Sequence, residues 1–229
     1  MTLNRITLIT DLPFKIPEIE YIGDKLPWHH SLKWDDRPLE NIRRIIVHHM
    51  ASESLLVNQA RYHINTHNWP GLSYHLAVSE GRLKQINDPR SITYHAAGNN
   101  EDSVSISIHG DLSKRELRAD ERELLYAGIL TLKKLFPIEE VIGHNEVNAT
   151  ACPCISMNQV RDDIARIESQ MRLANDPNKV KDEIRAAASQ HVYLFNQYQS
   201  DPVKHKWLEP HLLHIFEEMR SHGLFFGKY

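Results

Sequence analysis

Two histidines and one cysteine that lie far apart in the chain could together bind a metal ion. His48 ends a β-branched run, His144 follows the short apolar run Val141–Gly143, and Cys152 comes eight residues after His144. Two imidazoles and one thiolate suit zinc, and three protein ligands leave a fourth position for water, as in catalytic zinc sites. Spacing alone does not bring His48 to His144, so the set is a hypothesis that depends on the fold.

The second cysteine of the chain, Cys154, is separated from Cys152 only by Pro153. Two cysteines so close together form a poor disulfide, because the backbone between them is too short to relax. Each is therefore read either as a metal ligand or as a small buried hydrophobe.

The candidate ligands follow predicted strands, whose ends can bring side chains together at the rim of a sheet. Strands are predicted from β-branched runs and from alternation, and Val104–Ile108 has the period of a half-buried strand. Strands interleaved with helices predict an α/β domain on a single mixed sheet flanked by helices. The predicted strands lie at 43–48, 74–78, 83–86, 103–108 and 141–143, and the predicted helices at 55–65, 120–136 and 160–173.

Three regions are predicted along the chain. Residues 1–38 are interrupted by prolines and form an irregular N-terminal arm that wraps the domain, and residues 39–174 form the domain with the candidate ligands. The sequence Asn-Asp-Pro at 175–177 predicts a boundary. Residues 175–229 form a small helical region with predicted helices at 179–188 and 211–222. This region is either a separate binding module or a helical cap, and its aromatic residues are more typical of a core than of a binding surface.

Composition excludes several classes of protein. The 229 residues include 41% apolar and 25% charged residues with a net charge of −3, as in a folded globular protein. We expect no nucleic-acid partner, because the chain has no basic excess, and no membrane insertion, because no apolar stretch is long enough. The N-terminus lacks the apolar core of a secretory signal, so we expect synthesis in the cytoplasm and action on an external substrate only after release or export. We also expect a monomer.

Several motifs resemble the amidase type 2 family, which includes the phage T7 lysozyme-type amidases and the peptidoglycan recognition proteins. The resemblance covers roughly residues 40–168 and depends on the motifs occurring in the family's order with the His-to-Cys spacing intact. The motifs are Ile45-Ile46-Val47-His48-His49, Trp69-Pro70-Gly71-Leu72-Ser73-Tyr74-His75, Tyr94-His95-Ala96-Ala97-Gly98-Asn99-Asn100, His144-Asn145-Glu146-Val147 and Cys152-Pro153.

The resemblance implies an N-acetylmuramoyl-L-alanine amidase that cleaves bacterial peptidoglycan between N-acetylmuramic acid and L-alanine. It implies that Zn²⁺ is held by His48, His144 and Cys152, with Cys154 as a packed thiol, although Cys154 stays open as an alternative ligand. Together with the absent signal sequence, it indicates a phage or prophage endolysin rather than an exported bacterial autolysin. In such an enzyme residues 175–229 are either a cell-wall-binding module or a helical cap.

The resemblance also implies the residues around the metal. Tyr74 assists the water or stabilises the oxyanion, and Thr150 falls where relatives carry Lys or Thr. The alternatives are a tyrosine that only packs its ring and a threonine that caps the loop backbone. Residues that fall in the substrate-binding region are His49, Trp69, His95 and Asn100.

The sequence departs from the family pattern at two further positions. Met50 follows His49 where many relatives carry Thr, and Ser107 lies where some cytoplasmic relatives carry a catalytic Glu. The missing Glu disfavours a cytoplasmic recycling amidase.

Two other functions stay open at this point. A non-catalytic peptidoglycan-binding protein is one, although the presence of Cys152 argues for catalysis. A purely structural metal site is the other, and it would need a fourth protein ligand, for which Cys154 and His49 are the nearby candidates.

Overall fold

The computed structural model describes residues 4–174, 200, 201, 203 and 206. The chain divides into two compact units, Met1–Met171 and Arg172–Tyr229. The helices predicted at 179–188 and 211–222 lie outside the described residues. The boundary predicted between 174 and 175, and the role of residues 175–229, therefore stay predictions.

A six-stranded mixed sheet forms the centre of the first unit, with the strand order β1-β5-β4-β7-β3-β8. The central strand β7 is parallel to both β3 and β4, β8 is parallel to β3, and β5 is antiparallel to β4. The predicted α/β fold on a mixed sheet is confirmed. The strands are β1 (Glu20–Tyr21), β3 (Arg44–His49), β4 (Leu76–Ser79), β5 (Arg82–Gln85), β7 (Ser103–Ile108) and β8 (Glu140–Gly143), and β2 (Asp35–Asp36) pairs with β6 (Ser91–Ile92) in a second, two-stranded sheet.

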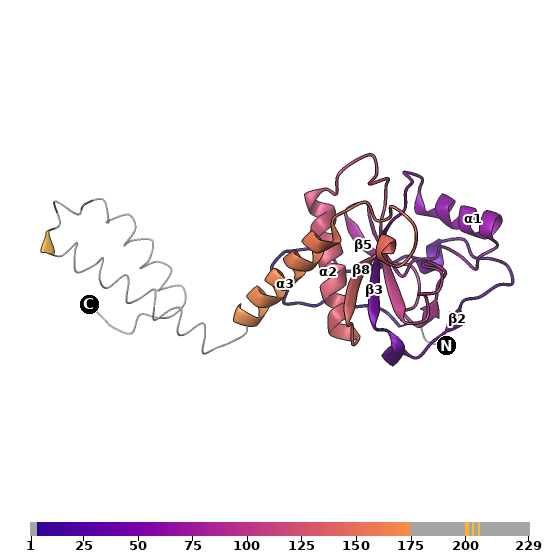
Figure 1. The fold of residues 1–229 in the computed structure, drawn as a ribbon, viewed down its shortest axis with the longest axis horizontal. Helices are drawn as coiled ribbons and strands as arrows, with labels where there is room; N and C mark the ends of the chain where they lie inside the picture. The colour runs from indigo at the N-terminus through magenta and orange to yellow at the C-terminus, as the bar shows by residue number, and fades with distance from the viewer. Residues whose placement is uncertain (1–3, 175–199, 202, 204–205, 207–229) are drawn as a thin grey trace. The chain divides into compact units, whose positions relative to one another are not determined.

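Helices lie on both sides of the sheet. The helices α2 (Ala119–Leu135) and α3 (Met157–Ala174) lie on one side, and α1 (Leu56–His67) lies on the other (Figure 1). Short 3-10 turns occur at Gly23–Lys25, Leu39–Asn41 and His144–Glu146. The sequence predicts an apolar face on α2 made of Leu124, Leu125, Ile129, Leu132 and Leu135. The first four are buried against the sheet, but Leu135, in the last position of the helix, is 48% exposed.

Alternation along β3 sends consecutive residues to opposite faces of the sheet. Ile45 and Val47 belong to the core cluster that also contains the buried residues of α2 and α3. Because successive side chains of a strand point to opposite faces, Ile46 and His48 face the other way. The same rule separates Leu76 and Val78 of β4 from Ala77, which packs with Leu56 and Ala60 of α1.

The predicted half-buried character of β7 is wrong, because all six of its residues are buried. Val104, Ile106 and Ile108 enter the core beside α2. The serines between them face the opposite side, and that side is covered too. Ser103 hydrogen-bonds His95, and Ser105 hydrogen-bonds His75. A central strand with both faces covered buries polar side chains that have partners.

The described part of the N-terminal arm is irregular apart from the 3-10 turn at Gly23–Lys25 and the strands β1 and β2, which pair with β5 and β6. Arg37 fixes the end of the arm, since its guanidinium is buried and donates to the carbonyl oxygens of Asn100 and Pro89. Trp28 packs over Gly71, where an added Cβ would lie 3.0 Å from the indole ring. The arm therefore belongs to the same compact unit as the sheet.

Candidate metal centre

The three residues predicted as metal ligands converge. One ligand atom from each of His48, His144 and Cys152 lies within 4.8 Å of the other two. The Sγ atom of Cys152 lies 3.7 Å from Nδ1 of His48, and the rings of His48 and His144 are 4.5 Å apart. Zinc–nitrogen and zinc–sulfur bonds in a tetrahedral site place such atoms about 3.6 Å apart. The nitrogen and sulfur donors therefore fit zinc in both type and spacing.

Parallel pairing of β3 and β8 brings the two histidines together. Val47 pairs with Gly143. His48, near the end of β3, and His144, directly after β8, therefore lie side by side. Gly143 is required here by close approach, because an added Cβ would lie 2.9 Å from Pro153. The absence of a side chain at Gly143 lets the loop that carries Cys152, here called the cysteine loop, approach the end of β8.

The turn that carries His144 is held in place by Glu146. The Glu146 carboxylate accepts a hydrogen bond from the backbone N–H of Gly143 and pairs with Arg161 of α3 at 3.0 Å. The backbone N–H of Asn145 donates to the carbonyl oxygen of Cys152 at 2.7 Å. These contacts join β8, the cysteine loop and α3, so the ligands are positioned by the backbone around them.

Burial favours the forms of the two imidazoles that bind metals. It lowers the pKa of His48 well below its usual range and lowers that of His144, so each ring keeps a lone pair at neutral pH. Burial also raises the pKa of the Cys152 thiol to about 11, although the backbone N–H of His49 donates to its sulfur at 3.4 Å. Metal binding here would release a proton from the thiol.

Within residues 4–174, no fourth His, Cys, Asp or Glu joins the three ligands. Both residues considered for that role lie elsewhere. His49 points to the opposite face of the sheet, and Cys154 directs its sulfur to Nε2 of His49, 3.7 Å away. A closed four-ligand site is therefore disfavoured, and an open three-ligand site fits better.

Tyr74 lies beside the candidate ligands, its ring 5.5 Å from that of His48. Burial raises the pKa of Tyr74 far above its usual value, with Cys152 adding to the effect, so the phenol keeps its proton and can donate. Ser107 is close enough to oppose this rise, but its buried hydroxyl has no partner in hydrogen-bond geometry. The Asn87 amide donates to the carbonyl oxygens of Leu72 and Tyr74, which fixes the segment.

Thr150 is exposed, and its hydroxyl oxygen accepts a hydrogen bond from the backbone N–H of Cys152 at 3.2 Å. This contact is the backbone cap considered as the alternative role for Thr150. The hydroxyl proton is not used in it, so a donor role beside the metal stays a prediction.

The residues predicted to bind substrate lie in different environments, and their roles stay predictions. Trp69 is half-buried and stacks on His67, with Tyr94 against its edge. Asn100 is turned inward, and its amide oxygen accepts from the backbone N–H of Ala96.

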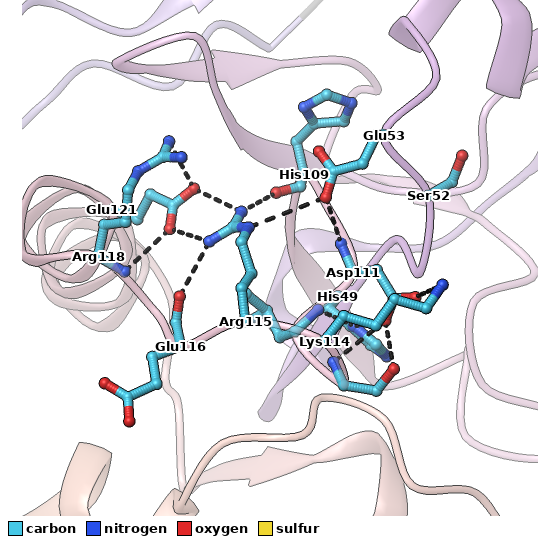
Figure 2. Close-up of polar contacts among 12 residues, drawn as sticks. His49, Ser52, Glu53, His109, Asp111, Lys114, Arg115, Glu116, Arg118 and Glu121 are labelled. Atoms are coloured by element: carbon cyan, nitrogen blue, oxygen red, sulfur yellow. Dashed lines mark hydrogen bonds and ion pairs between the residues drawn. The ribbon is translucent and has the colours of Figure 1, made fainter.

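His49 and His95 are buried, and both nitrogens of each ring have partners. His95 lies between His48 and Ser103. Nδ1 of His49 accepts from the backbone N–H of Leu112, in the loop that Figure 2 shows between His109 and Glu121. Neither imidazole has a free nitrogen to offer a substrate in this geometry.

Sequence reasoning missed several polar residues that hold the site. Asn87, Ser103 and His75 are all buried and hydrogen-bonded. The alternation of serines in β7 was the available signal, but alternation is equally typical of a solvent-facing strand. Only the covering residues distinguish the two cases.

The fold and the converging side chains define an α/β protein with a candidate three-ligand metal centre on one face of a mixed sheet. The sequence model of the N-acetylmuramoyl-L-alanine amidases matches residues 38–155, which is more than half of the chain. The chain belongs to the N-acetylmuramoyl-L-alanine amidase family. No curated protein gives a significant match.

Solved structures of similar fold include amidases and peptidoglycan recognition proteins. The amidase LysC from Clostridium intestinale URNW superposes with a TM-score of 0.55 at 18% identity, covering 65% of this chain and 98% of the other. Bumblebee PGRP-SA gives 0.56 at 19% identity, covering 63% and 94%. The endolysin of Thermus scotoductus MAT2119 bacteriophage Ph2119 gives 0.52 at 23% identity, covering 63% and 97%. At these identities the likeness establishes the fold. None of the described helices combines the length and apolar character needed to cross a membrane.

Proposed function

We propose that the protein is a zinc-dependent N-acetylmuramoyl-L-alanine amidase that hydrolyses the amide bond between N-acetylmuramic acid and L-alanine in bacterial peptidoglycan. The observation that carries the proposal is the convergence of His48, His144 and Cys152 within 4.8 Å, with no fourth ligand among residues 4–174. Membership of the amidase family supports the choice of substrate.

The protein's residues would divide the work of hydrolysis. When bound, zinc lowers the pKa of a coordinated water to about 7 and polarises a carbonyl group. The Tyr74 phenol, kept protonated by burial, donates a hydrogen bond to the oxygen that gains negative charge in the transition state. Thr150 adds a weaker, uncharged donor at the exposed side, and Trp69 offers an aromatic surface to the substrate.

We further propose that the protein acts as a monomeric endolysin that lyses bacteria. It would be made in the cytoplasm and reach the wall after release or export. The endolysin LysCS from Clostridium intestinale URNW and the phage Ph2119 endolysin are fold relatives with that name, which supports this assignment. The recognition proteins PGRP-LE and PGRP-LCx, solved with tracheal cytotoxin, support peptidoglycan as the ligand class.

The test is metal-dependent release of new amino groups from purified peptidoglycan. We expect L-alanine amino groups to appear with the zinc-loaded protein and to be lost with a chelator or with Cys152→Ser. Cys154→Ser is the matched control, because its sulfur contacts His49 rather than the candidate ligands, and it should retain activity.

Other outcomes would select the alternatives. Wall binding without release of amino groups would identify a non-catalytic peptidoglycan-binding protein. Loss of the folded state on chelation, with neither binding nor release, would identify a structural metal.

A further inference from the structure

A buried chain of hydrogen bonds leads from His48 away from the candidate metal centre. Nε2 of His48 lies 3.1 Å from Nδ1 of His95, and Nε2 of His95 lies 3.2 Å from the Ser103 hydroxyl oxygen. The Ser103 hydroxyl donates to the carbonyl oxygen of Asn99. His48, His95 and Ser103 are at most 6% exposed, so solvent does not compete for these contacts.

The chain has only one consistent arrangement of protons for neutral rings. A carbonyl oxygen can only accept, so the single hydroxyl proton of Ser103 goes to Asn99. The Ser103 oxygen must then accept from Nε2–H of His95. A neutral imidazole has one N–H, so Nδ1 of His95 is an acceptor and takes its proton from Nε2 of His48. The lone pair of His48 is thereby left on Nδ1, the atom that lies 3.7 Å from Sγ of Cys152.

The surroundings keep His95 neutral. The residue is 6% exposed and its ring lies against the rings of His48 and His75, and a buried charge without a counter-ion beside it is unfavourable. The far end of the chain is fixed as well, because Arg44 of β3 donates to the amide oxygen of Asn99 at 3.0 Å. The acceptor for Ser103 is therefore held in place.

We propose that Ser103 and His95 form a positioning pair that sets the tautomer and ring orientation of His48, so that Nδ1 is presented to the metal. His95 would then act through His48 and make no contact with substrate, unlike the role expected from its motif. The inference rests on the proposed metal function of His48. Partners of this kind, bonded to the second nitrogen of a ligating histidine, change metal affinity by about 10- to 100-fold.

Zinc affinity, measured by competition with a chromophoric chelator, tests the pair without any substrate. We expect His95→Leu to weaken zinc binding by about 10- to 100-fold. His95→Asn should restore much of the loss, because its amide oxygen can take the place of Nδ1 as acceptor. Ser103→Ala should also weaken binding, because His95 can then carry its proton on Nδ1 and donate it to Nε2 of His48, which leaves the proton of His48 on Nδ1.

Ser105→Ala is the matched control. Ser105 lies on the same face of β7, is equally buried and bonds an imidazole, but that imidazole belongs to His75. Its loss should cost similar stability and leave zinc affinity unchanged. Folded His95→Leu or Ser103→Ala protein with the zinc affinity of the unmodified protein would overturn the proposal. So would a raised KM in His95→Asn with metal affinity unchanged, since that is the signature of a substrate contact.

The metal-free protein gives a second, independent readout. Nitrogen NMR of ¹⁵N-labelled histidines should find the proton of both His48 and His95 on Nε2, and a proton on Nδ1 of His48 would contradict the inference. This readout also separates the two proposals. If the predicted tautomers and zinc affinities are found but no amino groups are released from peptidoglycan, the amidase assignment fails while the positioning pair stands.

Discussion

His48 and His49 are consecutive in the chain, and their imidazoles lie on opposite faces of the central sheet. His48 is one of the candidate metal ligands, while Nδ1 of His49 accepts a hydrogen bond from the backbone N–H of Leu112, in the loop between β7 and α2. Replacing His48 by alanine should therefore affect metal affinity, whereas replacing His49 by alanine should affect the stability of the fold. We expect His48→Ala to weaken zinc binding by more than about 100-fold, beyond the cost of losing an outer partner.

We expect His49→Ala to keep zinc affinity but to lower the free energy of unfolding by about 1–3 kcal/mol, because the Leu112 donor is left buried without a partner. Chelator competition and denaturant unfolding measure the two quantities separately. If His49→Ala instead raised KM with stability unchanged, the role predicted from its motif, a substrate contact, would be the correct one.

Tyr74→Phe should separate catalysis from binding. The ring and its packing against His48 and His63 stay, and only the hydroxyl donor is lost. We expect kcat to fall by about 100- to 1,000-fold, as for the loss of one oxyanion donor, with zinc affinity unchanged. The measurement is steady-state hydrolysis of a soluble muramoyl peptide. Full activity in the variant would show that Tyr74 contributes only the packing of its ring and not a hydrogen bond to the reaction.

The Arg115–Glu121 pair should stabilise the loop that leads into α2. Figure 2 shows the Arg115 guanidinium between this carboxylate, at 2.8 Å, and the carbonyl oxygen of His109. The Glu121 side chain is only 6% exposed. We expect Arg115→Ala to lower the unfolding free energy by about 2–3 kcal/mol. The loss should be smaller than for a buried charge left with no partner, because Arg118 still contacts Glu121.

An exposed ion pair provides the control for Arg115. Arg43 and Glu139 are 3.3 Å apart, with side chains 46% and 67% exposed. Arg43→Ala should change the unfolding free energy by less than about 1 kcal/mol. Equal losses of unfolding free energy in the two variants, measured by urea denaturation, would show that burial of Glu121 does not strengthen its ion pair with Arg115.

His63 should make stability depend on pH. Burial lowers its folded pKa from 6.5 to about 4, with His67 adding to the effect. The unfolded state binds the proton first, so the stabilisation is present above about pH 6.5 and is lost as the pH falls towards 4. Allowing for partial exposure, we expect a loss of about 1–2 kcal/mol between pH 7 and pH 5.

Unfolding of His63→Asn at the two pH values measures this contribution. Asn retains an acceptor for the backbone N–H of Ser73, which bonds Nδ1 of His63. The variant should lose less stability on acidification than the unmodified protein. An identical pH dependence in both would assign the effect to other buried histidines, such as His75, whose pKa burial lowers to about 3.

The sequence alone determined the fold class and predicted the candidate ligand set, for local reasons. Strand and helix periods are properties of neighbouring residues, so the elements around His48 and His144 could be placed within a few positions. The ligand types and their order along the chain carried the family resemblance. Their convergence depends on the pairing of β3 with β8, which nothing in the sequence required.

The tertiary structure decided which face of the sheet each polar residue occupies and whether that face is covered. The alternating serines of β7 have the pattern of a solvent-facing strand face, yet His75 covers Ser105 and His95 covers Ser103. His95 was placed with the substrate by its motif, and the fold surrounds it with His48 and Ser103. Alternation fixes only that neighbouring side chains point apart, and what lies over each face depends on residues distant in the chain.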